Sequence, residues 1–301
     1  MIRSARRIEA MRLGAVLSNH ALVHSRLRLH AVKNARVVSE DDLLLRAFQR
    51  AGAVGRPVVT ILLAGRARVR AHGEEAWLEA GEVLGMDHKG AVSMRQEGEA
   101  YSALAFEWDV ELLGPRPKPF QRARLAGVDT DEATAIWHAV VHGVGRPEAL
   151  VERHVQVLAK LGFPVRTASA DELTEPVPEA TQKMSRGLDF ALSNLEGQPM
   201  TADLEKVLGL GARQVNRLVQ AFNQRYGFNA TGWRDTRNRR RLMMGATLMT
   251  AKGATVGYVA RVVGYRSPTA FARALADAGM PAPGRIPALV EGMARPARMT
   301  A

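Results

Sequence analysis

Along the first 110 positions, hydrophobic residues recur mainly with a period of two, which favours strands. Val58 to Val69 begins as a continuous apolar run and, after Gly65, continues with arginines that alternate with small apolar residues. A similar alternation runs from Val23 to Ala31. Shorter strands bounded by turns are expected at residues 77–78, 83–86, 93–95 and 101–108. Short strands separated by glycine turns predict a small antiparallel β-barrel.

Other parts of the N-terminal half are predicted as helices. An opening helix is expected from Arg3 to Asn19 and a short one from Glu40 to Gln49. After a proline-rich stretch, Asp129 to Val141 is expected to form a helix capped by Asp129 or Thr130, with acidic residues in its first turn. Pro147 to Leu161 carries an apolar stripe at helical spacing.

A change of composition marks the expected domain boundary. Residues 168–180 contain Pro176, Pro178 and four carboxylates, which is typical of a linker. We therefore expect a β-barrel domain with helices at 1–167 and a linker at 168–180. An all-α domain at 181–290 and a tail at 291–301 complete this division.

After the linker, the pattern predicts a helix-turn-helix unit. Thr201 is expected to cap a short helix at 202–208, with Glu205 as its capping-box partner. The turn Gly209-Leu210-Gly211 follows, and then a longer helix runs from Ala212 to Tyr226 and is ended by Gly227.

The longer helix has two distinct faces. Its apolar positions share one stripe: Val215, Leu218, Val219 and Phe222. Its opposite face contains no carboxylate and presents Arg213, Gln214, Asn216, Arg217, Gln220 and Gln224. Arginine can bond guanine bidentately, and glutamine or asparagine can bond adenine in the same way. We predict that this face binds DNA; the alternative is an ordinary solvated face.

A second unit repeats this order of elements. A long helix is expected at 234–249, a short one at 256–263 capped by Thr255, and a last one at 268–278 with Ser267 as its N-cap. Its candidate DNA contacts are Arg266, Ser267, Thr269 and Arg273. In the long helix, phosphate contacts are expected from Arg237, Arg239 and Arg240. Arg241 is expected to be structural, paired with acidic residues between the units.

Charge supports a nucleic-acid partner. The chain has 301 residues and a formal net charge of +12. From residue 181 onward there are 18 basic and 7 acidic residues, whereas the first 180 residues hold 24 and 23. A general preference for arginine in the source proteome would not explain this asymmetry, and a phosphate backbone would.

The C-terminal part of the chain resembles a known protein family. Residues 183–289 resemble the DNA-binding domain of AraC/XylS-type transcription regulators. The ordered residues that carry the resemblance are Arg241-Leu242, Ala246, Leu248-Met249, Val256, Val259-Ala260, Val263-Gly264-Tyr265, Ser267, Phe271 and Arg273. The resemblance implies two helix-turn-helix units joined by a long helix, with both recognition helices in successive major-groove segments. Phe228-Asn229-Ala230 replaces the family's usual Ser-Pro.

The N-terminal half resembles, through its strand-turn rhythm alone, the cupin-type barrel of such regulators. The resemblance implies an effector-sensing and dimerisation domain. Double-stranded DNA is the expected partner, and RNA polymerase, a small-molecule effector and a second copy of the chain are partners to be tested. Activation is the expected direction, although the residues do not distinguish it from repression. Trp77, Tyr101, Phe106 and Trp108 could line a pocket, but core packing is the simpler interpretation.

Two other classes remain open: a cupin-like enzyme with a basic accessory domain, and a protein-interaction module. Against the enzyme, His72 and His88 are 16 residues apart without a nearby partner, and His24 and His30 are expected to be solvated. We expect no metal, no cofactor and no catalysis. The chain contains no cysteine and no apolar run of bilayer length, and the basic start lacks a clean apolar segment. A cytoplasmic protein is expected.

Overall fold

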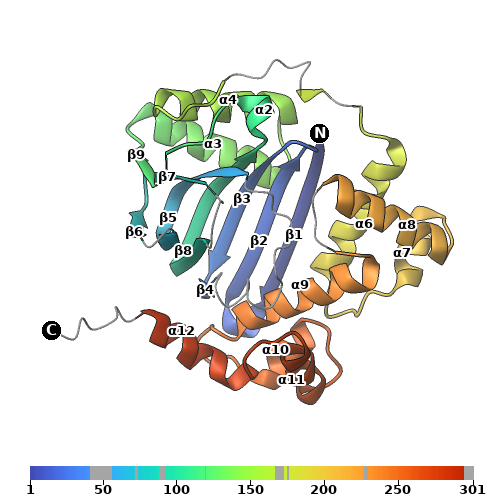
Figure 1. Ribbon diagram of the computed structural model, residues 1–301. Helices are drawn as coiled ribbons and strands as arrows, with labels where there is room; N and C mark the ends of the chain where they lie inside the picture. Colours follow the sequence, from blue (N-terminus) through green and yellow to red (C-terminus); the bar gives the residue numbers. More distant parts are fainter. Residues whose placement is uncertain are drawn as a thin grey trace.

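The computed structural model describes residues 1–40, 56–71, 74–87, 92–118, 120–166, 173–174, 176–226 and 230–294. Within these residues, a sheet formed by the N-terminal part is followed by a C-terminal part made of helices (Figure 1). All strand pairs are antiparallel. The α+β class predicted from the sequence, with an antiparallel sheet before a helical region, is confirmed.

Nine strands form one sheet in the order β1-β2-β3-β8-β5-β7-β9, with β4 paired to β8 and β6 paired to β5. The path of hydrogen-bonded strands ends at β1 and at β9. The strand bounds are β1 Ile2–Ala10, β2 Ala15–Val23, β3 Leu27–Ala35, β4 Ser39–Glu40, β5 Pro57–Ala71, β6 Glu74–Glu79, β7 Glu82–Asp87, β8 Val92–Trp108 and β9 Gln121–Arg124.

The opening helix predicted at residues 3–19 is wrong, because this segment forms the hairpin β1–β2. A single 3₁₀ turn, η1 (Met11–Leu13), connects the strands, and Gly14 closes it at φ 59°. Ile8 lies opposite Leu17, and both side chains are buried. Met11, which the helical stripe would have buried, is 84% exposed. The short apolar runs fit either period, and strand pairing with β3 decides between them.

Smaller corrections concern the other strands. The alternation at 23–31 contains a turn, since β2 ends at Val23 and β3 begins at Leu27. The strands expected at 93–95 and 101–108 are parts of one long strand, β8. The helix expected at 40–49 lies outside the described residues except for Glu40, which belongs to β4. The strands at 58–69, 77–78 and 83–86 are confirmed within β5, β6 and β7.

The two helices predicted at 129–141 and 147–161 are present as α3 (Val128–His142) and α4 (Pro147–Lys160). The helix α3 packs on β2, β3, β5 and β8, α4 packs on α3, and apolar side chains of both helices share a core with these strands (Figure 1). Gly127, not Asp129 or Thr130, is the N-cap of α3. The helices of this half are α2 Val110–Leu113, α3 Val128–His142 and α4 Pro147–Lys160.

The C-terminal helices follow the order expected from the sequence. The first begins at Glu179, inside the segment predicted as linker, of which residues 173–174 and 176–178 are also described. The bounds are α6 Glu179–Ser193, α7 Thr201–Leu208, α8 Ala212–Arg225, α9 Trp233–Leu248, α10 Val256–Val262, α11 Pro268–Asp277, η2 Pro283–Arg285 and α12 Ile286–Ala294. In the described part of the chain, no helix combines the length and apolar character required to cross a membrane.

The outer strands of the sheet share a hydrophobic core with the C-terminal helices. Ile2, Ile8 and Leu17 belong to the same buried cluster as Leu188 of α6 and Val219 of α8. The helix α6 runs beside β1, while α9 and α10 lie near the turn that joins β1 to β2 (Figure 1). The helical region is therefore packed directly on the edge of the sheet.

Candidate nucleic-acid interface

The first helix-turn-helix unit consists of α7, a short turn and α8. Gly209 adopts φ 67°, a conformation that favours glycine, and its N–H donates to the carbonyl of Glu205 at 2.8 Å. Gly211 is the N-cap of α8. The predicted cap of α7 shifts by one residue, because Met200 is the N-cap and its N–H donates to Asp203 at 2.6 Å.

One face of α8 is fixed to the protein. Val215 and Val219 are fully buried, and Phe222 is buried beside the ring of Tyr226 with centroids 4.8 Å apart. The amide of Asn223 is also buried and donates to the carbonyl of Ala230 at 3.1 Å and to the hydroxyl of Thr236 at 3.0 Å. Apolar packing and these bonds hold α8 against α9, so its orientation is set by the fold.

The opposite face of α8 is free. All six side chains predicted to contact DNA are exposed: Arg213, Gln214, Asn216, Arg217, Gln220 and Gln224. None of them forms a hydrogen bond or an ion pair with any other residue that the structure describes. Because α8 contains no carboxylate, neither arginine is neutralised along the helix. The face can therefore donate and accept hydrogen bonds to an external partner.

The second unit consists of α10 and α11. The caps are those predicted: Thr255 accepts a bond from the N–H of Tyr258, and Ser267 accepts one from the N–H of Ala270 at 3.1 Å. The hydroxyl oxygen of Ser267 therefore has an internal role. The other three candidate contacts of this unit are exposed: Arg266, Thr269 and Arg273.

The turn of the second unit is tightly packed against the end of α6. Gly264 adopts φ 81°, and a Cβ atom built on it would lie 2.0 Å from the carbonyl oxygen of Leu195. The same Cβ would lie 2.9 Å from a guanidinium nitrogen of Arg241. Only glycine fits here, and the close approach positions the second unit relative to α6.

Four of the five arginines of α9 are engaged or enclosed within the protein, whereas Arg234 is exposed. Arg237 donates to the carbonyl of Pro199 at 2.7 Å, and Arg239 forms an ion pair with Asp235 at 2.8 Å. Burial lowers the pKa of Arg240 to about 9, with Arg6 nearby acting in the same direction. Arg241 is buried, as expected for a structural residue, but its guanidinium lies 5.4 Å from the ring of Tyr265 rather than on an acidic side chain.

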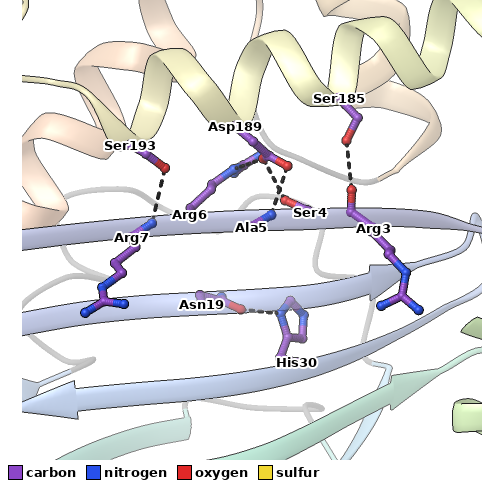
Figure 2. A network of polar contacts seen from close by, with 10 residues as sticks. All are labelled: Arg3, Ser4, Ala5, Arg6, Arg7, Asn19, His30, Ser185, Asp189 and Ser193. Atoms are coloured by element: carbon purple, nitrogen blue, oxygen red, sulfur yellow. Dashed lines mark hydrogen bonds and ion pairs between the residues drawn. The ribbon is translucent and has the colours of Figure 1, made fainter. Parts of the chain in front are cut away.

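A polar seam between α6 and β1 was not anticipated (Figure 2). Asp189 accepts bonds from the Ser4 hydroxyl at 2.8 Å, the Ala5 N–H at 2.9 Å and Arg6 Nε at 3.0 Å. One turn away on either side, Ser185 donates to the carbonyl of Arg3, and Ser193 accepts from the N–H of Arg7.

The three α6 side chains of this seam recur every four residues, on one face of the helix. The three side chains bond backbone groups of β1, which within the described residues pairs with β2 alone. The spacing of Ser185, Asp189 and Ser193 was the only sign of this seam in the sequence.

The described part of the sheet region contains no cluster of metal-ligating side chains. No group of three or more histidine, aspartate or glutamate side chains suited to a metal occurs among the described residues, and His72 and His88 lie outside them. His24 is buried, contrary to the expectation that it is solvated. Tyr101, Phe106 and Trp108 are core residues, whereas Trp77 is 37% exposed.

The fold and the free face of α8 define a protein with two helix-turn-helix units behind an antiparallel sheet. No protein-family model matches the chain, and no curated protein matches it. Solved structures similar to it include the AraC-like transcriptional activator CuxR, with 12% identity over 75% of this chain and 86% of that one, at a TM-score of 0.34.

Two further structures are similar over parts of the chain. ToxT from Vibrio cholerae shows 11% identity over 83% of this chain and 93% of its own, at a TM-score of 0.32. The EutQ protein of Clostridium difficile shows 10% identity over 35% and 77%, at 0.25. An AraC-like transcriptional activator is thus among the similar structures. Identities and TM-scores of this size do not assign a shared function.

Proposed function

We propose that this chain is a sequence-specific DNA-binding regulator of transcription. The observation that carries the proposal is the outward face of α8, where six polar side chains are exposed and have no partner among the described residues. A major groove admits one α-helix, and arginine, glutamine and asparagine are the side chains that distinguish guanine and adenine there.

The second unit contributes a smaller surface. Arg266, Thr269 and Arg273 are exposed on or beside α11, and two of them carry a positive charge. We assign Arg266 and Arg273 to phosphate contacts that set the register of the protein on the duplex. Arg237, Arg239 and Arg240 are left out of this contact set because each is engaged or enclosed within the protein.

The test begins with selection of bound duplexes from a random library, because the target DNA sequence has to be found first. Affinity for the selected duplex is then measured by fluorescence anisotropy over a range of KCl concentrations. We expect R213A/R217A to weaken binding by about 10²- to 10⁴-fold, because each bidentate arginine contributes about 1–3 kcal/mol. The decrease of affinity with rising KCl concentration should also become less steep for each phosphate contact that a substitution removes.

The matched control is Arg124→Ala, which removes an exposed arginine of β9 whose side chain forms no hydrogen bond or ion pair with another described residue. It should leave affinity within about twofold, as expected for a charge far from the interface. Unchanged affinity of R213A/R217A would contradict the proposal. Salt-insensitive retention of any duplex by the unmodified protein would instead favour a protein-interaction module.

A further inference from the structure

A basic cleft lies where the sheet meets the second helix-turn-helix unit. Its volume is about 460 Å³, which is within the range of small-molecule sites. It is lined from the sheet side by Arg12, Arg36 and Glu99, and from the helical side by Lys252, which lies between α9 and α10. None of these residues belongs to the proposed DNA-contact set.

The backbone of Arg36 is held by the fold in an uncommon conformation. Arg36 adopts φ 55°, a backbone conformation that residues other than glycine rarely adopt. Its backbone N–H donates to the carbonyl of Glu99 at 3.2 Å. Its guanidinium approaches Gly14 so closely that a Cβ there would lie 2.8 Å from a guanidinium nitrogen. The lack of a Cβ at Gly14 leaves room for this guanidinium, and the Arg36 side chain, which is 62% exposed, pairs with Glu99 at the cleft.

The sheet wall of the cleft is tied to the helices through Arg12. The N–H of Arg12 donates to the hydroxyl of Tyr258 on α10 at 3.1 Å, and the guanidinium carbon lies 5.7 Å from the Tyr258 ring. This contact brings the β1–β2 turn beside the segment that contains Lys252 (Figure 1). The cleft thus has one wall from the sheet and one from the helical region.

The charge of the cleft is unbalanced. Three cations face one carboxylate, Glu99, which pairs with Arg36 at 3.4 Å while its side chain stays 90% exposed. Lys252 is exposed and has no hydrogen bond or ion pair with another described residue. A guanidinium fork matches the oxygens of phosphate bidentately, and an ammonium adds a point charge. We propose that this cleft binds a small phosphate-bearing anion, which bridges the sheet and the helical region.

The direct test is isothermal titration calorimetry of the full-length protein with pyrophosphate as the probe, in a phosphate-free buffer at constant ionic strength. We expect saturable binding by the unmodified chain. K252Q and R36Q should each weaken it by about tenfold, because each removes a charge-assisted contact. E99Q should tighten it about threefold, since removal of the carboxylate raises the net positive charge of the cleft.

The control is Lys33→Gln, which removes an exposed lysine of β3 outside the cleft and should leave binding unchanged. The tightening in E99Q is an effect that damage to the fold would not produce, so it complements R36Q. Absence of saturable binding, or equal weakening by K33Q and K252Q, overturns the proposal. The proposal is also overturned if K252Q loses duplex binding while the unmodified protein binds no pyrophosphate. That result would make these cations a DNA-backbone contact. The titration contains no DNA, so its result does not depend on the proposed function.

Discussion

At the scale of single residues, His154 of α4 has an environment that opposes its charged form. It is fully buried, and its ring lies 5.1 Å from that of Phe106 in an edge-on contact. Neither ring nitrogen has a hydrogen-bond partner within the described structure. Burial lowers the pKa of His154 to about 3. The folded protein therefore holds this imidazole in its neutral form.

This environment predicts a pH-dependent contribution to stability. An unfolded histidine has a pKa of about 6.5, so between that pH and the folded pKa of His154 the unfolded chain binds a proton that the folded chain does not. Stability is lost as pH falls through this window, by about 2 kcal/mol between pH 7.5 and pH 5. H154L removes the titrating group. Between pH 7.5 and pH 5, its free energy of unfolding in urea should therefore fall by about 2 kcal/mol less than that of the unmodified protein. Parallel pH profiles for the two proteins would contradict the assignment.

At the scale of elements, the turn of the second helix-turn-helix unit depends on the close approach at Gly264. Gly264→Ala introduces a methyl group 2.0 Å from the carbonyl oxygen of Leu195, at a residue with φ 81°. Gly253→Ala is a matched control, because Gly253 has φ 79° but nothing within 4 Å of the added Cβ. Both variants therefore carry the left-handed backbone strain, and only one carries the clash.

We expect G253A to lose about 1–2 kcal/mol of stability from backbone strain. G264A should lose at least about 3 kcal/mol, because strain and overlap add. Urea unfolding followed by circular dichroism measures both values. Equal losses in the two variants would show that the contact between Gly264 and α6 is unimportant.

The same elements show which parts of the fold could be predicted from the sequence. In the helical region, glycines and capping residues bound segments with a period of 3.6, so α8, α10 and α11 could be predicted, with the N-caps Thr255 and Ser267 of the last two. In β1 and β2, short apolar runs are separated by polar residues and fit a helix as well as a strand. Pairing with β3 decides the outcome, and it involves residues that are distant in sequence.

For the candidate site, local periodicity was sufficient to predict which side of α8 is exposed, because one amphipathic helix contains that information. The engagement of Arg237 by the carbonyl of Pro199 could not be predicted, since it joins residues 38 positions apart through tertiary packing. The basic cleft likewise combines Arg12, Arg36 and Lys252 from distant segments. Charge alone did not distinguish enclosed arginines from free ones.

At the scale of the whole molecule, the sheet and the helical region act as one packed body. Their shared core contains Ile8 and Leu17 from the hairpin together with Leu188 and Leu192 from α6. Two backbone-directed bonds reinforce it at other points: Arg28 donates to the carbonyl of Tyr226, and Val38 donates to the hydroxyl of Thr250 at 2.8 Å. The positions of α8 and α11 therefore depend on the sheet.

Asp189 should be the main polar determinant of this docking. D189A removes the acceptor of three hydrogen bonds from β1, and we expect a loss of about 2–3 kcal/mol in urea unfolding, because a charged acceptor disappears from a half-buried seam. S193A removes one bond to the backbone of Arg7 and should cost about 1 kcal/mol. Phe190→Ala is the control on the same helix, since Phe190 is 66% exposed.

The same substitution also changes what the edge of the sheet can do. Without Asp189, the N–H of Ala5 loses its acceptor, and β1 lies at one end of the strand path. An edge strand with unpaired backbone groups is a template for pairing with another chain. We therefore expect D189A, but not F190A, to self-associate with rising concentration in analytical ultracentrifugation. A monodisperse D189A with unchanged stability would mean that apolar packing alone joins the sheet to the C-terminal helices.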